Sequence, residues 1–198
     1  MDSVLEVIEA GPLSTIQDLG RFGYQRFGIS ASGVMDAPAF RLANALAGND
    51  DAAAGIEMTL AGMTLKVRAS RCHIAYVGAP APVTVDGSPI PPGTSAFADE
   101  GAVISIGAMR SGLRGYLAIA GGVLSEPVLN SRATHTRSGI GGLDGGPLKA
   151  GDLIPILPCS DGDTCRELDP ELLPSFEGPV RVLLGPQNDL FTAAGIAT

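Results

Sequence analysis

Short runs of apolar and β-branched residues, separated by glycine-rich turns, dominate the hydrophobic pattern of the chain. Many short strands joined in this way are typical of a β-barrel or a β-sandwich. Asp86-Gly87 follows one run and favours a hairpin, and Ala61-Gly62 separates two others and suggests a second hairpin. The predicted strands are Leu5–Ile8, Ile56–Leu60, Met63–Val67, Ile74–Val77, Val83–Val85, Val103–Ile106, Tyr116–Ile119 and Leu153–Leu157.

One amphipathic helix is predicted shortly after the first strand. Asp36 can cap its N-terminus, Pro38 lies in its first turn, and Gly48 follows its last turn. Apolar residues three and four positions apart, among them Phe40 and Ala43, form one face of this helix. Because a single short helix accompanies many strands, we expect it to plug an open end of the barrel.

An acidic, proline-rich stretch at 158–179 changes the character of the chain and is interpreted as a surface linker. The first domain is therefore expected to span residues 1–157. After the linker, Val180–Leu184 is predicted to form a strand. Residues 180–198 are interpreted as the start of a second module, which is expected to be truncated at Thr198.

Composition limits the classes of partner. The chain has 198 residues, of which 45% are hydrophobic, so a single large domain can bury a core. Its net charge of −8 opposes phosphate backbones, so nucleic acid is not expected as a partner. No signal peptide is recognised, and the apolar runs are too short to span a membrane. A soluble, cytoplasmic protein is predicted.

Metal and disulfide chemistry are not expected. The three cysteines, Cys72, Cys159 and Cys165, fit neither a disulfide framework nor a zinc site, so we interpret them as buried free thiols. The two histidines, His73 and His135, lie far apart in the sequence, and no metal motif is visible. The sequence also contains no Met-Lys-Met biotin-attachment segment and no Walker A spacing.

The first segment with candidate chemistry runs from Ser14 to Arg21 and follows directly after a strand. Arg21 can bind a carboxylate with two parallel hydrogen bonds. Asp18 can orient Arg21 or accept a proton. The alternative is a salt-bridged β-turn without a catalytic role, and the sequence alone leaves both interpretations open.

The second segment with candidate chemistry is Ser32–Asp36, which leads into the predicted helix, and two further polar residues lie in the helix and in a strand. Asp36 is interpreted as the helix cap, although a helix N-terminus also favours anions. Asn44 lies one turn from Phe40 and is expected to be semi-buried, where its amide needs partners. Glu57 lies among apolar strand residues. Its side chain lies either on the solvent-exposed face of the strand or in the interior. A buried carboxyl group can act as an acid or a base.

The third segment with candidate chemistry extends from Asn130 to Arg137 and leads into a glycine-rich stretch. Ser131, Arg132 and Thr134, together with glycine amides, are suited to hold a carboxylate, a carbamate or a phosphate. A flexible polar loop is the alternative. His135 is either an acid–base residue or, more simply, an exposed loop histidine.

These segments together resemble the KipA-like family, also called allophanate hydrolase subunit 2 or the C subunit of 5-oxoprolinase, which is related to biotin-dependent carboxyltransferases. The resemblance covers nearly the whole chain. Asn130 stands where the family usually has glycine, and family members continue well beyond Thr198. The matching segments are, in order, Pro12–Arg21, Ser32–Asp36, Ala43–Asn49, Glu57, Arg114–Gly122, Ser131–Thr134, Gly151-Asp152, Gly185–Gln187 and Asp189–Thr192.

The resemblance implies a mainly β, cyclophilin-like barrel with one or two short helices. It implies a KipI-like partner subunit and a small amide substrate. The implied activity is ATP-dependent opening of 5-oxoproline to glutamate, for which a LamB-like subunit is a further partner, or carboxyl transfer from carboxybiotin to urea. ATP is then expected at the level of the complex, and carboxybiotin must arrive on another protein.

The resulting hypothesis assigns roles to the polar residues. Asp18 and Glu57 are the acid–base or orienting candidates. A second hypothesis from another class is a non-catalytic regulatory module that binds a KipI-like kinase inhibitor. The residues expected to bind the substrate are Arg21, Asn44, Ser131, Arg132 and Thr134.

Overall fold

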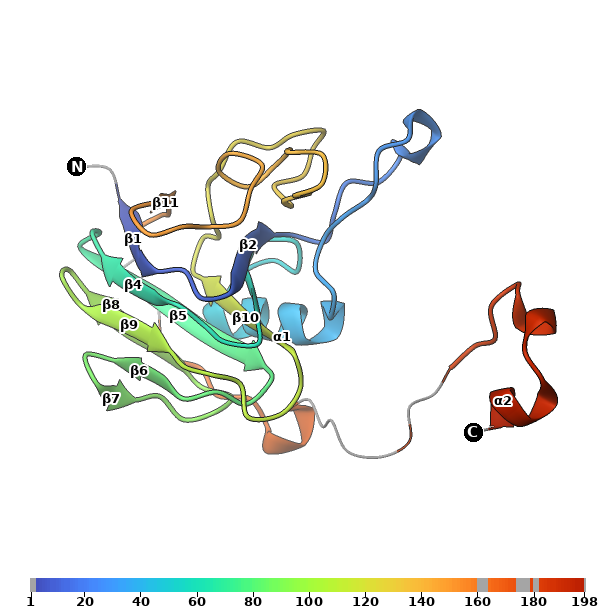
Figure 1. The fold of residues 1–198 in the computed structure, drawn as a ribbon. Coiled ribbons are helices and arrows are strands. Elements are labelled where there is room, and N and C mark those ends of the chain that lie inside the picture. The colour runs from blue at the N-terminus through green and yellow to red at the C-terminus, as the bar shows by residue number, and fades with distance from the viewer. Residues whose placement is uncertain (1–2, 160–163, 174–178, 180–181, 198) are drawn as a thin grey trace.

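Two antiparallel β-sheets form the body of the protein in the computed structural model, which describes residues 3–159, 164–173, 179 and 182–197 (Figure 1). The predicted mainly β fold with few short helices is confirmed. The first sheet has the order β11-β1-β4-β9-β6-β7 and contains β1 (Val4–Glu9), β4 (Thr64–Val67), β6 (Val83–Val85), β7 (Ser88–Pro89), β9 (Val103–Ile106) and β11 (Leu153–Pro155). The second has the order β2-β3-β10-β5-β8 and contains β2 (Leu13–Gln17), β3 (Gly55–Thr59), β5 (Arg71–Gly78), β8 (Ser95–Asp99) and β10 (Arg114–Ile119).

The main core lies between the two sheets. Leu5 of β1 and Ile104 of β9 reach it from the first sheet, and Ile56 of β3 and Leu117 of β10 reach it from the second. All four side chains are fully buried. Because side chains alternate across a strand, the neighbours of Ile56 and Leu117 point to the opposite face of the second sheet. That outer face is where the helix and the polar loops lie.

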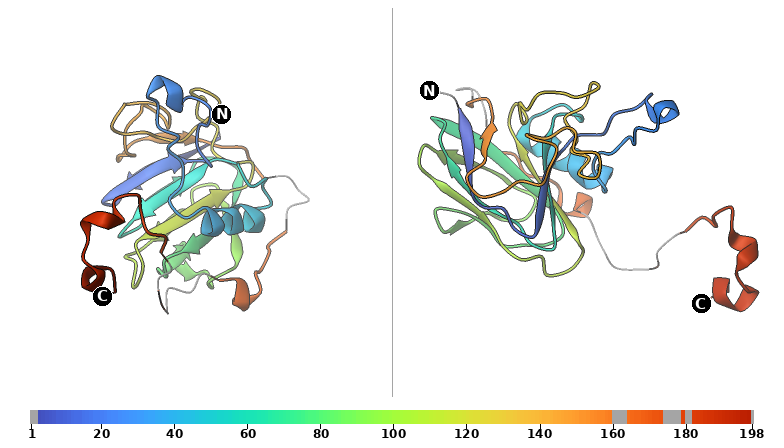
Figure 2. Two further views of the ribbon diagram at one scale, coloured as in Figure 1. Left: turned by 90° about the vertical axis from the view of Figure 1, so that its right-hand side faces the viewer. Right: turned by 45° about the horizontal axis from the view of Figure 1, so that its top comes forward.

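The predicted helix is α1 (Ala37–Ala47), and it begins and ends as expected. The Asp36 carboxylate accepts a hydrogen bond of 3.0 Å from the Ala39 N–H, and Gly48 ends the helix in the left-handed conformation. The expectation that the helix plugs a barrel end is wrong, because α1 lies across the outer face of the second sheet (Figure 2). Phe40 there packs edge-on against Tyr116 at 5.8 Å. Among the described residues, the other α-helix is the short α2 (Ala193–Ala197), and 3₁₀ turns occur at Gln25–Phe27, Pro170–Leu172 and Asn188–Leu190.

The two predicted hairpins have different outcomes. Asp86-Gly87 joins β6 to β7, which pair antiparallel, and both residues have the positive φ of a tight hairpin turn. Ala61-Gly62 does not form a hairpin, because β3 and β4 belong to different sheets. Gly62 lies where the chain crosses between the sheets, and a Cβ atom there would be 2.2 Å from the side chain of Ile106. A close crossing and a hairpin both favour glycine, so the sequence signal is the same for each.

Part of the predicted linker is paired with the second sheet. The Ser95 N–H donates to the Arg166 carbonyl at 2.9 Å, and the Leu168 N–H donates to the Gly93 carbonyl at 2.8 Å. These bonds extend the sheet beyond β8. Of the predicted strand at 180–184, residues 180 and 181 lie outside the described residues, and 182–184 have no regular secondary structure.

The cysteines are free, but the expectation that all are buried is wrong. Cys72 is buried, whereas Cys159 is half-buried and Cys165 is exposed. Burial raises the pKa of the Cys72 thiol to about 12. Across the described residues, no helix is both long and apolar enough to cross a membrane.

Candidate functional site

A row of polar side chains crosses the outer face of the second sheet beside the N-terminus of α1. In the register of the sheet, Thr15 of β2 lies opposite Glu57 of β3, and Glu57 lies opposite Tyr116 of β10. Their neighbours Ile16 and Ile56 point to the main core. All three polar side chains are nevertheless buried. A buried polar row of this kind needs partners from the loops above it.

Glu57 has two partners of different kinds. One carboxylate oxygen accepts a hydrogen bond of 2.9 Å from Arg114 Nη1, which also forms an ion pair with it. The other oxygen accepts a hydrogen bond of 2.7 Å from the Met35 N–H. The Glu57 residue is 6% exposed, so the buried alternative for this residue is correct. Arg114 is held in place by a second bond of 2.7 Å from Nη1 to the Thr59 hydroxyl.

Tyr116 joins Glu57 to the helix N-terminus. Its hydroxyl oxygen accepts a hydrogen bond of 2.7 Å from the Asp36 N–H. Burial raises the pKa of Tyr116, and the nearby charge of Glu57 raises it further, because both disfavour the phenolate. Tyr116 therefore remains a neutral hydroxyl throughout the physiological range.

Asp18 holds a second loop against the end of β2. Its carboxylate accepts hydrogen bonds from Gly20 N at 2.8 Å, Ser131 Oγ at 2.7 Å and Arg132 N at 2.6 Å. Two of these donors belong to the loop at 128–134, which is distant in sequence. Three short, charge-assisted bonds fix the position of this loop on the strand end.

Arg21 points inward instead of toward solvent. The residue is 1% exposed, and its Nε donates to the Val128 carbonyl at 3.3 Å while Nη2 donates to the Ala133 carbonyl. Burial lowers the pKa of the guanidinium, and the charge of Asp18 opposes this effect. Among the described residues, the ion pairs within 4.0 Å do not include Asp18 with Arg21. Arg21 thus fastens the backbone of the same loop that Asp18 holds.

The segment from Ser32 to Asp36 connects the main chain of Asp18 to the Glu57 carboxylate. The Val34 N–H donates to the Asp18 carbonyl at 3.0 Å, and the next N–H, of Met35, donates to Glu57. The segment can pass this close because Gly33 has a φ of 94°, and a Cβ atom there would be 2.8 Å from the backbone of the 18–21 loop. The loops at 18–21, 32–36 and 128–134 with Glu57, Arg114 and Tyr116 are called the three-loop cluster below.

Thr134 and Arg132 take different positions in the cluster. The Thr134 hydroxyl donates to the Ile16 carbonyl at 2.8 Å, and its own carbonyl accepts from Ser32 Oγ at 2.8 Å. Arg132 is half-buried, and its Nε donates to the Ser125 carbonyl at 2.7 Å. The terminal nitrogens of Arg132 form no hydrogen bond with the described residues. Arg21 also has one nitrogen without a partner among the described residues, the buried Nη1, but the half-buried Arg132 has both terminal nitrogens unbonded there and therefore more donors to spare for an anion.

Asn44 is not brought into the cluster. It lies seven residues along α1 from Ala37, which is about 10 Å of helix. The amide is fully buried, donates to the Ala53 carbonyl at 3.0 Å, and accepts from Asn49 Nδ2 at 3.0 Å. Its hydrogen bonds fasten the end of the helix to the following loop.

Arg114 and Tyr116 lie in a segment that carries the family resemblance, but the sequence motifs assigned neither of them a role in a site. The sequence signal that could have indicated them is their spacing. Residues two positions apart on a strand lie on the same face of the sheet, so Arg114 and Tyr116 point the same way. Two buried atoms of the cluster, Arg21 Nη1 and Arg114 Nε, and one beside it, Gln17 Oε1, have no hydrogen-bond partner in the described part of the chain. Such atoms are uncommon in folded proteins, and a binding or catalytic role is one explanation for them. The described residues contain no group of three or more His, Cys, Asp or Glu side chains suited to a metal ion.

Comparison with known proteins places the chain in a family. Residues 27–198 match the family model for the carboxyltransferase domain, subdomain A and B. The chain belongs to this family. The matched region includes the 32–36 and 128–134 loops and Glu57, whereas Asp18 and Arg21 precede it.

Two curated relatives and one crystal structure extend the comparison. The chain is 39% identical to the C subunit of 5-oxoprolinase from Escherichia coli over 153 residues, covering 77% of this chain and 49% of that protein. It is 38% identical to urea amidolyase from Saccharomyces cerevisiae over 173 residues, covering 87% of this chain and 9% of that protein. The crystal structure of Kluyveromyces lactis urea carboxylase superposes with a TM-score of 0.80 and 31% sequence identity. The match covers 89% of this chain and 16% of that chain. The chain thus spans about half or less of these relatives.

Proposed function

We propose that this carboxyltransferase-family chain is a subunit, or part of a subunit, of an enzyme that processes a small amide or lactam. The reaction we favour is the ATP-dependent opening of 5-oxoproline to glutamate, in a complex with a KipI-like subunit and a LamB-like subunit. The similarity to the C subunit of 5-oxoprolinase supports this substrate. The similarity to urea amidolyase supports the alternative, carboxyl transfer to urea.

The observation that carries the proposal is the continuous hydrogen-bonded path from Asp18 through the 32–36 segment to Glu57. This path starts at the main-chain carbonyl of Asp18, and the Asp18 carboxylate separately binds Ser131 and the Arg132 N–H, so Asp18, Glu57 and Arg132 belong to one connected frame. Such a preorganised frame is what acid–base and anion-binding groups need in order to act without further rearrangement. Asp18 positions the loop through Ser131 and the Arg132 N–H, and Thr134 locks the far side of that loop.

Arg132 is proposed to bind the substrate anion. 5-Oxoproline carries a planar carboxylate, which a guanidinium can bind with two parallel hydrogen bonds. Glu57 is proposed as the residue that accepts or orients a proton of the amide. ATP is required by the assembled complex, and carboxybiotin enters only on another protein if urea is the substrate.

Reconstitution with the KipI-like and LamB-like partners tests this function. We expect ATP-dependent formation of glutamate from 5-oxoproline, and about a tenfold or greater loss with Arg132→Gln, because a charged hydrogen bond is lost. Arg41→Gln is the matched control, because Arg41 lies on the exposed side of α1 and, within the described part of the chain, forms an ion pair only with Asp51. A stable complex without turnover of 5-oxoproline or urea would support the regulatory module instead.

A further inference from the structure

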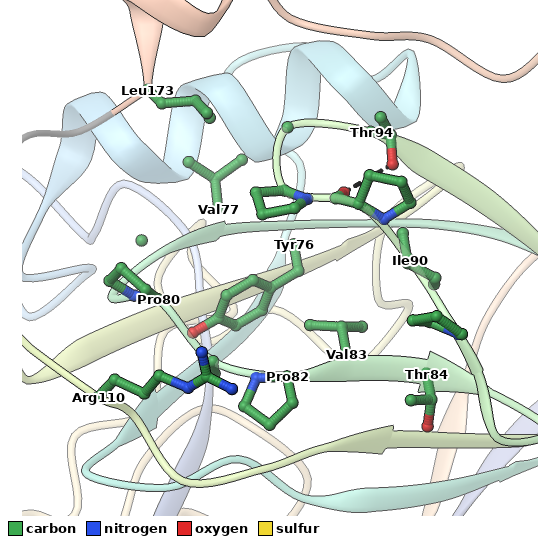
Figure 3. Close-up of a pocket in the computed structure, with 16 residues that line it drawn as sticks. Tyr76, Val77, Pro80, Pro82, Val83, Thr84, Ile90, Thr94, Arg110 and Leu173 are labelled. Atoms are coloured by element: carbon green, nitrogen blue, oxygen red, sulfur yellow. Dashed lines mark hydrogen bonds between the residues drawn. The ribbon is translucent and has the colours of Figure 1, made fainter.

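A separate cavity of about 400 Å³ opens where the edges of the two sheets move apart (Figure 3). Tyr76 of β5 and Val83 of β6 face each other across it, one from each sheet. The loops at 78–82 and 89–94 close its sides, and Leu173 from the downstream segment forms one end. None of these residues belongs to the three-loop cluster.

The walls of this edge cavity are rigid and almost entirely apolar. Prolines at positions 80, 82, 89, 91 and 92 line it, and each fixes its own φ angle. The Ile90 N–H donates to the Val83 carbonyl at 2.9 Å, which ties the two sides together. The cavity is therefore preformed, and its walls lose little entropy when a ligand enters. Its volume lies within the range of about 300–1,000 Å³ typical of small-molecule sites.

Few polar groups face the cavity, and two of them already form hydrogen bonds with backbone carbonyls. The Tyr76 hydroxyl donates to the Ala79 carbonyl at 2.6 Å, and the Thr94 hydroxyl donates to the Pro91 carbonyl at 2.7 Å. Arg110 also lines the cavity, and its side chain extends to the same end as the Tyr76 hydroxyl in Figure 3. Arg110 is exposed and takes part in none of the ion pairs among the described residues. The cavity thus combines an apolar interior with one unpaired cation at its mouth.

We propose that the edge cavity binds a small organic anion with an apolar body, of the class of medium-chain carboxylates. The chain or ring of the ligand fills the space between Tyr76, Pro82 and Val83. Its carboxylate pairs with Arg110 at the mouth, where it also stays in contact with water. An uncharged or cationic ligand of the same shape gains the apolar contacts but not the ion pair. This site is independent of the proposed function.

Calorimetric titration of the full chain with decanoate, decan-1-ol and decylamine tests the proposal. We expect decanoate to bind most tightly and decylamine most weakly. Arg110→Gln should weaken decanoate about fivefold and leave decan-1-ol unchanged, as expected for one exposed ion pair. Arg41→Gln, the control arginine on α1, should change neither affinity.

A second pair of variants tests the apolar part of the site. Ala81→Phe should fill the cavity and weaken both decanoate and decan-1-ol about tenfold or more, because the buried apolar area is lost. Thr84→Phe is the replacement if circular dichroism shows that Ala81→Phe is misfolded. The proposal is overturned if decanoate shows no binding heat up to millimolar concentration. It is also overturned if decanoate binds equally well to the filled and the wild-type cavity, which indicates association elsewhere.

Discussion

At the residue scale, the two arginines of the three-loop cluster show how similar side chains divide structural and binding roles. Arg21 is 1% exposed and directs two of its nitrogens at backbone carbonyls. Arg132 uses one nitrogen for the Ser125 carbonyl and keeps its terminal nitrogens unbonded within the described residues. A guanidinium with several rigid donors can fasten a loop in a way that a single ammonium cannot. The two bonds of Arg21 therefore serve the fold, whereas Arg132 is the arginine that we propose for binding a ligand.

Arg21→Lys should destabilise the fold by about 2 kcal/mol, because at least one charge-assisted bond to a buried carbonyl is lost. The measurement is urea denaturation followed by circular dichroism. Arg41→Lys, on the exposed side of α1, should change the free energy of unfolding by less than about 0.5 kcal/mol. If Arg21→Lys unfolds like the wild type, the buried contacts to Val128 and Ala133 do not hold the loop.

Glu57→Gln should also lower stability, by about 2 kcal/mol, because the charge-assisted bonds from Arg114 and Met35 are weakened. Part of the Arg114 side chain is buried, and its cation would lose its partner. The double variant Glu57→Gln/Arg114→Gln should lose less than the sum of the single variants. Glu126→Gln, at an exposed position, is the control. Additive losses in the cycle would show that the pair contributes no coupling.

At the element scale, α1 depends on a cap that also borders the candidate site. Asp36→Ala should cost about 1 kcal/mol of unfolding free energy, because the Ala39 N–H loses its acceptor. Asp36→Ser should recover most of this loss, since a serine oxygen accepts the same bond. Urea denaturation of the three proteins gives the values. Equal stability of the alanine and serine variants would mean that water replaces the cap without cost.

Strands made of apolar and β-branched runs were predictable, but β2 and β8 were not. The reason is clear for β2. Its residues Ser14, Thr15 and Gln17 are polar yet buried, so the segment resembles a turn in the sequence. It becomes a strand because β3 pairs along its whole length and the 128–134 loop covers its polar side. Burial of this kind is decided by contacts distant in sequence, which local periodicity does not register.

The position of α1 on the second sheet likewise could not be predicted from the local sequence pattern. Its cap, its first turn and its final glycine could be predicted from chemistry within a few residues of the helix. Its partner surface could not, because Ala75 and Ala118 come from strands far along the chain. Small alanines there let the helix approach the sheet face closely. A helix that packs on a face and one that plugs an opening share the same amphipathic pattern.

At the scale of the whole molecule, the three polar segments are recognisable in the sequence but their connections are not. Asp18 and Ser131 are 113 residues apart, and only the fold brings them within 2.7 Å. Asn44 belongs to a similar polar motif, yet it fastens the far end of α1. Arg114 could not be predicted as a partner of Glu57, because the register of β3 with β10 cannot be derived from either strand alone.

The stability of the whole fold should fall at high pH. Burial raises the pKa of Tyr116 and of Tyr76 above the value of about 10 for an exposed tyrosine, and it raises that of Cys72 to about 12. Above these ordinary values the unfolded chain has lost protons that the folded chain retains. The unfolded state then binds fewer protons, so the free energy of unfolding decreases as pH rises.

Urea denaturation at pH 8, 9, 10 and 11 measures this effect. The free energy of unfolding should begin to fall near pH 9, where Cys72 ionises in the unfolded chain, and should fall more steeply near pH 10, where the tyrosines do so. Each group contributes at most about 1.4 kcal/mol per pH unit. Tyr116→Phe starts from a lower stability at pH 8, because the Asp36 N–H loses its acceptor, but it should decline less steeply above pH 10. Tyr24→Phe is the control, because Tyr24 is only half-buried and lies outside both sheets. A Tyr116→Phe curve parallel to that of the wild type would show that this phenol already ionises in the folded state.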